Sequence, residues 1–349
     1  MTTLSSKAGA VTLLDWAKSV DPDGKTATVV ELLNQSNEIL LDMPFIEGNL
    51  VTGHRASLRA ALPAVVWRKL YQGVPASKSL RATVEDACGM LEARSEVDKD
   101  VADLNGNTGD FRLSEAQAFL ESMNQTMADS VIYGDASVNP ERFNGLAQRY
   151  YTISTGTSEI AKNVISAGGS GNCTSVWLVV WGKQTVHGIF PKGSKAGLMH
   201  QDLGEIDAFD GSNNRYRAYA DRWQWKIGMH VKDWRYVVRI ANISLTDLLG
   251  QSGTQANTAS TWLPKLMVKA MARIPFMGMG TPVFYASRTV KEMLSVGAID
   301  KSQQVMSIQE AVNQFGTVSP GSVSSGGLRM LGVPIRTVDR ILETETALT

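Results

Sequence analysis

The sequence predicts an α+β fold, and three patterns carry this prediction. Residues 52–87 alternate in polarity along two segments joined by a turn, residues 114–133 repeat apolar side chains at helical spacing, and the second half is mostly strand. Runs of strands separated from runs of helices are typical of this class. With 349 residues, 43% of them hydrophobic, the chain can form one large domain or two closely joined domains around a real core.

The first 45 residues are predicted to form an arm followed by a short helix. Residues 1–27 are polar and rich in small side chains, so they cannot build a core alone. A capping box at Thr28 and Glu31, followed by apolar residues at helical spacing, predicts a helix that ends near Pro44. The arm carries three apolar residues that could dock on a partner: Leu13, Leu14 and Trp16.

Residues 52–87 predict a long two-stranded hairpin that turns at residues 73–75. An isolated hairpin is marginally stable in water, and this one has basic and aromatic side chains on both faces. We therefore expect the hairpin to need an external partner. The candidate contact residues are Arg55, Arg59, Trp67, Arg68, Lys69 and Tyr71.

Residues 114–133 predict the longest helix, about 30 Å in length. Ser114 and Gln117 have the spacing of a capping box, and Gly134 stands where the helix should stop. One apolar stripe should face a sheet that includes part of residues 216–243; it consists of Ala116, Leu120, Met123, Met127 and Val131.

The second half predicts strands first and helices later. Apolar runs at 175–181 and 185–190 read as strands, followed by a loop at 191–201 that holds Lys192 and Lys195. The remaining predictions are a turn at 210–214, strands within 216–243, helices at 261–274 and 287–296, a short helix capped by Ser307 and Glu310, and a closing strand from Gly332 to Arg336.

Composition excludes few functions, but motifs point away from catalysis. Lys+Arg and Asp+Glu both number 34, which argues against a protein whose main task is to grip a phosphate backbone. The two cysteines lack CxxC spacing, the longest apolar run (176–181) is too short to cross a bilayer, and the start of the sequence lacks the layout of a signal peptide. We therefore expect a protein made in a cytoplasm, with no membrane partner.

No catalytic, cofactor-binding or metal-binding residue is nominated by the sequence. The HExxH, GxxxxGK[ST] and GxSxG patterns are absent, and His187 lies in an apolar strand, as a core or interface histidine would. We predict a protein that is not an enzyme and uses no cofactor or metal. Catalytic triads are assembled in space, so an α+β hydrolase remains the alternative from a different functional class.

Six stretches resemble the major capsid proteins of tailed bacteriophages of the short-tailed type, which have the Hong Kong 97-like fold. The most specific lies within 176–205 and contains Gly188-Ile189-Phe190-Pro191-Lys192-Gly193-Ser194 and Asp202-Leu203-Gly204-Glu205. The other stretches are 43–49, 91–98, 133–146, 233–243 and 332–336.

This resemblance implies four structural parts. They are an N-terminal arm with a short helix (1–45), an E-loop hairpin (46–90), a peripheral domain with a spine helix at 114–133 (91–150, 205–255 and 331–349), and an axial domain (mostly 151–204 and 256–330). The arm and hairpin residues named above, together with Arg142, Lys192 and Lys195, become candidate contacts between subunits.

The implied function is self-assembly into pentamers and hexamers of an icosahedral virion shell, built in the host cytoplasm around phage DNA. The implied partners are other copies of the chain, a decoration or cement protein, a scaffolding protein, a portal, and double-stranded DNA contacted without sequence specificity. An encapsulin-like nanocompartment shell is the alternative within the same fold.

Overall fold

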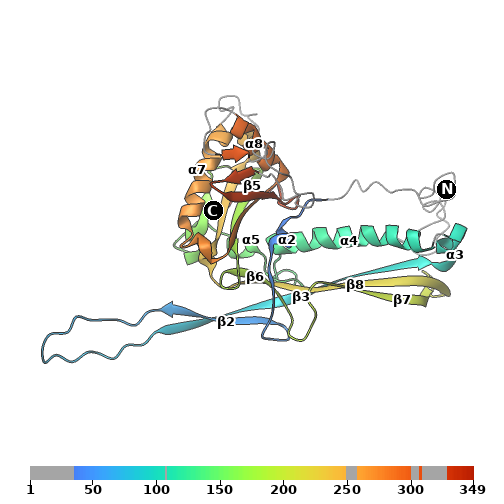
Figure 1. The fold of residues 1–349 in the computed structure, drawn as a ribbon, viewed down its shortest axis with the longest axis horizontal. Helices are drawn as coiled ribbons and strands as arrows, with labels where there is room; N and C mark the ends of the chain where they lie inside the picture. The colour runs from blue at the N-terminus through green and yellow to red at the C-terminus, as the bar shows by residue number, and fades with distance from the viewer. Residues whose placement is uncertain (1–34, 107, 249–257, 300–305, 309–327) are drawn as a thin grey trace, which may run out of the picture.

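The computed structural model describes residues 35–106, 108–248, 258–299, 306–308 and 328–349. The described chain has a body of sheet and helices, a long platform that extends to one side from the base of the body, and a hairpin that projects from the same base to the other side (Figure 1). The main path of hydrogen-bonded strands runs β11-β12-β13-β10-β5-β6-β8-β3-β2. The mixture of long strands, one long helix and several shorter helices confirms the predicted α+β class.

Strand β5 (Cys173–Trp181) is the centre of the body. It pairs antiparallel with β9 (Val237–Ser244) on one side and with β10 (Thr281–Ala286) on the other, and all nine of its residues are buried. Successive side chains of a strand point to opposite faces. Helices α7 (Thr258–Arg273) and α8 (Arg288–Ile299) therefore cover one row of β5 side chains, which consists of Val176, Leu178 and Val180.

The other row of β5 side chains faces a second apolar cluster, formed by the end of the long helix and by residues close to the C-terminus. This row consists of Trp177, Val179 and Trp181, which pack with Met127, Val131 and Ile341 among others. The smaller elements around these layers are α2 (Ile39–Asp42), β1 (Phe45–Glu47), α5 (Leu146–Arg149), η2 (Glu159–Asn163), β4 (Val164–Ser166), β6 (Val186–Phe190), η3 (Trp234–Tyr236), α6 (Leu245–Leu248), η4 (Met277–Met279), β11 (Met306–Ile308), β12 (Leu328–Met330) and β13 (Val333–Thr337).

The platform combines one helix with three long strands. Helix α4 (Thr108–Tyr133) lies along β3 (Leu80–Asp98) and β8 (Arg215–Val231), and β7 (Leu198–Phe209) pairs with β8 (Figure 1). Two short elements, α3 (Lys99–Ala102) and η1 (Leu104–Gly106), connect β3 to α4. Met123 and Met127 are buried on the face of α4 that packs on the strands, and Phe119 of α4 stacks on Trp223 of β8 with 5.6 Å between ring centroids. The prediction of one unbroken helix that faces strands from 216–243 is confirmed.

The predicted start of the long helix is wrong. Helix α4 begins at Thr108, six residues before the expected Ser114, so Ser114 and Gln117 lie inside the helix and do not cap it. The cause is tertiary packing, because Phe111 is buried with Val97 and Ala102 at the end of the platform. Burial of an apolar side chain in an extra helical turn outweighs a local capping signal.

The hairpin projects as predicted, but its turn is misplaced. The ladder joins β2 (Gly53–Ala61) to β3 only up to the pair Ala61 and Leu80. Beyond it the chain continues as two segments outside the ladder and turns at residues 69–72, where Gln72 donates its backbone N–H to the carbonyl of Lys69 and Tyr71 has φ of 62°. The expected turn at 73–75 is therefore wrong. Pro63 and Pro75 lack an N–H, so neither can continue the ladder toward the tip.

The predictions for three shorter segments also need correction. The described part of the predicted 28–44 helix is not continuous, because Asn37 forms an antiparallel bridge with Val338 and only α2 is helical. The loop predicted at 191–201 ends at 197, since Leu198 already pairs with Trp225 in the β7–β8 ladder. Ser307 pairs with Arg329 in a strand and caps no helix, while Glu310 and residues 1–34 lie outside the described residues.

The chain's C-terminal residues are fixed to the body by a buried charge network. Glu345 accepts hydrogen bonds from Arg239 Nη2 at 2.9 Å, from the hydroxyl of Tyr133 at 2.5 Å, and from Ser175. Arg239 also donates to the carbonyl of Tyr150 and lies over the ring of Trp177, 4.9 Å from its centroid. This network joins α4, β5, β9 and the C-terminal segment at one point.

Replacing Glu345 with alanine should strongly destabilise the subunit. The change leaves the guanidinium of Arg239 buried without its counter-charge, which costs about 3–5 kcal/mol. Chemical denaturation of the dissociated subunit measures this loss. Glu343→Ala, a change two residues away at a half-buried side chain, is the matched control and should alter the unfolding free energy by about 0.5 kcal/mol or less. Equal effects of the two changes would contradict a structural role for the network.

Candidate assembly surfaces

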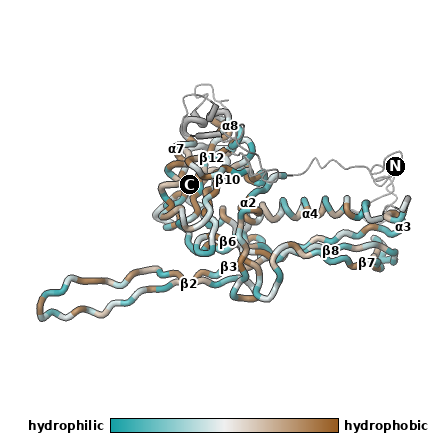
Figure 2. Tube along the Cα trace, viewed as in Figure 1, coloured by the Kyte–Doolittle hydropathy of each residue, from teal (hydrophilic) through white to brown (hydrophobic). Residues whose placement is uncertain are grey.

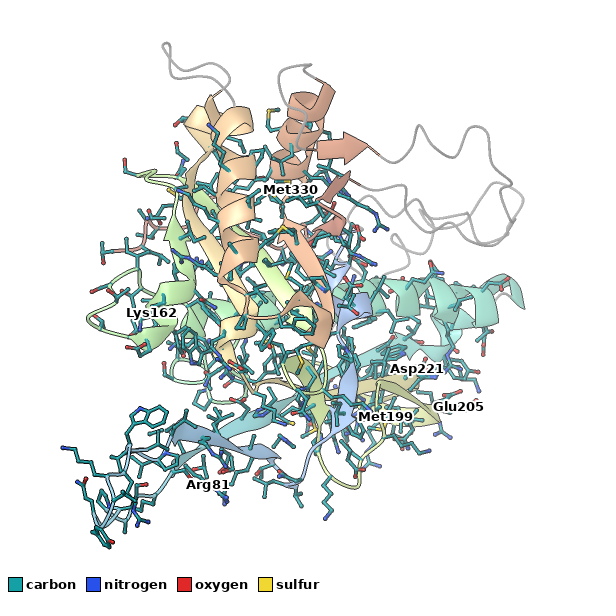
Figure 3. The ribbon with its side chains drawn as sticks, turned by 60° about the vertical axis from the view of Figure 1, so that its left-hand side comes forward. Arg81, Lys162, Met199, Glu205, Asp221 and Met330 are labelled. Carbon is teal, nitrogen blue, oxygen red and sulfur yellow. The ribbon has the colours of Figure 1, made fainter. Side chains whose placement is uncertain are left out.

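The tip of the hairpin exposes its large apolar side chains to solvent. Trp67 and Tyr71 have 101% and 102% of the accessibility of an extended peptide, and Val65 and Leu70 reach 90% and 89%. Apolar stretches alternate with polar ones along the hairpin (Figure 2), and its side chains stand away from the rest of the described chain (Figure 3). A contiguous exposed patch of this kind marks an interaction site in soluble proteins.

The hairpin is also strongly basic. Residues 56–84 contain five basic side chains and no Asp or Glu; the five are Arg59, Arg68, Lys69, Lys78 and Arg81. Arg59 stands directly opposite Arg81 in the strand ladder, and like charges in opposite positions destabilise a sheet. An acidic surface against the hairpin would relieve this repulsion. Arg55 is different, because its guanidinium pairs with Glu85 across the hairpin at 2.6 Å.

The other predicted contact residues lie in separate places. Lys192 and Lys195 are exposed on the loop 191–197. This loop is fixed to residues 47–50, because the backbone N–H of Lys192 donates to the carbonyl of Leu50 and that of Gly193 donates to the carboxylate of Glu47. Arg142 pairs with Asp129 of α4 at 3.2 Å, so it contributes to the subunit itself. Leu13, Leu14 and Trp16 lie outside the described residues. The structure thus gathers six of the predicted contact residues on one projecting hairpin, namely Arg55, Arg59, Trp67, Arg68, Lys69 and Tyr71, while Arg142, Lys192 and Lys195 lie elsewhere in the described chain.

A hollow of about 490 Å³ between α4 and the β7–β8 hairpin was missed by the sequence reasoning. Its apolar lining includes Leu113 and Leu198, which are exposed at 60% and 42%, together with Ala116, Leu120 and the stacked ring of Trp223. His200 stacks on the same Trp223 with 5.4 Å between ring centroids.

The polar side of this hollow is organised around Arg112. Its guanidinium bonds to Asp202 and Asp221, which face each other in the β7–β8 ladder. Burial opposes the charge of Arg112, but the two carboxylates outweigh it and raise the pKa of this guanidinium. The backbone N–H of Gly204, followed by Arg112, lowers the pKa of Asp202. A register shift between Asp202 and Gly204 in the β7–β8 ladder places Asp202 opposite Asp221. The turn predicted at 210–214 would by itself pair Asp202 with Arg222, so the sequence held no clear signal for this carboxylate pair.

The Cys88 thiol and the arrangement of possible metal ligands bear on the chemistry of the described residues. Burial raises the pKa of the Cys88 thiol to about 11, so this thiol stays protonated and is a poor nucleophile. Within the described ranges, no group of three or more His, Cys, Asp or Glu side chains is arranged to hold a metal ion. No described helix is both long and apolar enough to cross a membrane.

Comparisons with known proteins identify the family. The model of the family described as major capsid protein GP7 matches residues 21–349. A chain in the structure of bacteriophage Epsilon15 is 31% identical, with 97% of this chain and 98% of that chain covered and a TM-score of 0.73. A search of curated proteins found no match.

Two more distant solved structures also match. One is the bacteriophage JBD30 capsid (8% identity, 88% of this chain and 92% of that chain, TM-score 0.46), and the other is an encapsulin complex from Synechococcus elongatus PCC 7942 (10%, 67% and 96%, 0.43). At these TM-scores neither likeness carries an argument. The GP7 match over nearly the whole chain and the Epsilon15 likeness together place this chain in the major capsid protein GP7 family, as a shell-forming subunit of the Hong Kong 97-like fold.

Proposed function

We propose that this capsid subunit assembles into pentamers and hexamers of an icosahedral shell that encloses double-stranded DNA, and that its hairpin lies on a neighbouring subunit. The observation that carries the proposal is the hairpin tip, which exposes Trp67 and Tyr71 fully beyond a strand ladder in which Arg59 stands opposite Arg81. Burying one large apolar side chain contributes about 1.5–3 kcal/mol, so a few such contacts repeated in every subunit can hold a shell together.

The proposed domain division follows the predicted one. The arm and short helix cover 1–45, the E-loop hairpin 46–90, the peripheral domain 91–150 with 205–255 and 331–349, and most of the axial domain 151–204 with 256–330. Residues 331–349 contact both proposed domains: β13 pairs with β10 of the axial domain, and Glu345 accepts a hydrogen bond from Tyr133 at the end of α4 in the peripheral domain.

The same proposal includes the further binding partners of the subunit. Lys192 and Lys195, exposed on one loop, suit contacts with a neighbouring subunit, while the zero net charge suits loose contact with DNA without sequence preference. A decoration or cement protein, a scaffolding protein and a portal would complete the particle, which would assemble in the host cytoplasm. As a capsid protein the chain has a structural role in the virion. Family membership does not favour the nanocompartment or the hydrolase.

Replacing Trp67 and Tyr71 with alanine should weaken assembly without weakening the fold. Both side chains are fully exposed in the subunit, so the unfolding free energy should change by about 0.5 kcal/mol or less. The loss of their burial at an interface should raise the protein concentration needed for assembly by about tenfold or more. Sedimentation of particles and thermal unfolding of dissociated subunits measure the two effects.

Val138→Ala is the matched control for these changes, because Val138 is 72% exposed on the turn after α4 and away from the hairpin. This control should assemble like the original protein. If the double variant also assembles normally, the hairpin tip is not a contact between subunits.

Reversing the charge of Arg68 and Lys69 to glutamate should weaken assembly most at low salt. Residues 56–84 of the hairpin carry only positive charge, so an acidic neighbouring surface attracts the original tip and repels the variant. Because the Debye length is about 10 Å at 0.1 M salt and shorter above it, the difference between the two proteins should shrink as salt is added. Light scattering during assembly follows this change, and indistinguishable assembly at low salt would rule out an acidic contact.

Removal of residues 1–27 should also impair assembly more than folding. The arm carries Leu13, Leu14 and Trp16 in a polar segment that cannot bury them itself. Thermal unfolding of the truncated subunit, compared with sedimentation of its particles, separates the two roles. Particles of normal size and stability would show that the arm is not a clamp between subunits.

A further inference from the structure

Three of the four histidines meet where the hairpin leaves the body. His54 comes from β2, His187 from β6 and His230 from β8, and their ring centroids lie 4.7 to 6.0 Å apart. The rings meet edge to face, with interplanar angles of 64° to 76°. His187 and His230 are buried, and His54 is half-buried above them.

The cluster occupies the junction between two ladders of β3. From Leu80 to Ala87 this strand pairs with β2 in the hairpin, and from Cys88 to Asp98 it pairs with β8 in the platform. Asp86 is buried at this junction, and its carboxylate accepts hydrogen bonds from His230 Nδ1 and from Arg149 of α5, both at 2.6 Å. The rings thus fill the space where β2 packs against the body.

The surroundings of His54 and His187 favour neutral imidazoles. The charged and titratable groups that act on the cluster are Asp86 and Cys88 of β3, Arg149 of α5, and Lys232 just after β8. Asp86 is the single carboxylate in this set and is already paired with Arg149. His230 Nε2 and His187 Nδ1 are buried without a hydrogen-bond partner, so a proton added to either atom would lack an acceptor.

We propose that this histidine cluster is an acid-sensitive latch, which holds the base of the hairpin on the body at neutral pH and releases β2 when the imidazoles take up protons. Protonation of His54 and His187 places two positive rings 6.0 Å apart beside Arg149 and Lys232, with the one carboxylate of Asp86 to balance them. Moving β2 away brings the rings into water, where their charge is solvated. The latch is a property of the subunit and does not depend on the proposed contacts of the hairpin tip.

The direction of the pH effect follows from the pKa values. Burial, then the neighbouring histidines, lowers the pKa of His187 to about 4, and burial with His230 lowers the pKa of His54. The ordinary pKa of a histidine is about 6.5. A histidine whose pKa is lowered in the closed state stabilises that state at pH values above about 6.5, and this stabilisation is lost as the pH falls toward 4. For His187 alone, the ratio of closed to open hairpin should fall about 30-fold between pH 7.5 and pH 5.

Hydrogen exchange followed by mass spectrometry of the full-length dissociated subunit tests the latch. After correction for the intrinsic pH dependence of exchange, protection of the amides of residues 53–61 should fall about tenfold or more between pH 7.5 and pH 5. Protection of β5, residues 173–181, should stay constant over the same range because this strand is buried on both faces and carries no histidine. Unchanged protection of 53–61 in the original protein would overturn the proposal.

Variants of the histidines test whether these rings cause the fall in protection of residues 53–61. In His54→Gln with His187→Gln the fall in protection should shrink to about threefold or less, whereas His200→Gln, a change of the one histidine outside the cluster, should keep the full fall. An undiminished fall in the double variant would contradict the latch. If the amides of β5 are not protected at pH 7.5 in the double variant, that variant is not folded, and His54→Gln alone provides the test because a half-buried ring tolerates this change. The single variant must then show a smaller fall in the protection of residues 53–61 than the original protein.

Discussion

The whole architecture depends on β5 being buried on both faces. Its alternate side chains pack under α7 and α8 on one side and against the end of α4 and the C-terminal segment on the other. Apolar packing of this kind fixes the strand's register, since a slip of one residue would exchange Val176, Leu178 and Val180 with Trp177, Val179 and Trp181. The Arg239–Glu345 pair reinforces the same place, where it joins β9 to the C-terminal segment over Trp177.

The platform and the hairpin extend from this rigid body and have much less packing of their own. Helix α4 covers one side of the long β3–β8 ladder and leaves the hollow beside β7 lined with Leu113, Leu198 and Trp223. The hairpin keeps its strands paired only to Ala61 and then exposes an apolar, basic tip. A subunit of a shell can leave these surfaces uncovered because other copies cover them, which agrees with the family to which the chain belongs.

Local patterns predicted the elements whose stability is local or dominated by apolar burial. The run at 175–181, the turn at 210–214 and the end of the long helix at Gly134 all lie close to where the residues indicated. The start of α4 was wrong because Phe111 packs against Val97 and Ala102, a contact that no helical period contains. The hairpin turn was wrong because Pro63 and Pro75 end the ladder early. The basic and aromatic tip could be read from sequence, whereas the histidine cluster could not, since His54, His187 and His230 meet only through pairing of distant strands.

The central claim is that the exposed hairpin is completed by a second subunit. A cryo-electron microscopy reconstruction of particles assembled from the full-length chain tests this most directly, because it shows what surrounds the hairpin in the shell. We expect Trp67 and Tyr71 to lie buried against a neighbouring subunit, with acidic side chains of that subunit close to the basic residues of the tip. A hairpin that remains surrounded by solvent in the particle, or that folds back on its own subunit, would contradict it.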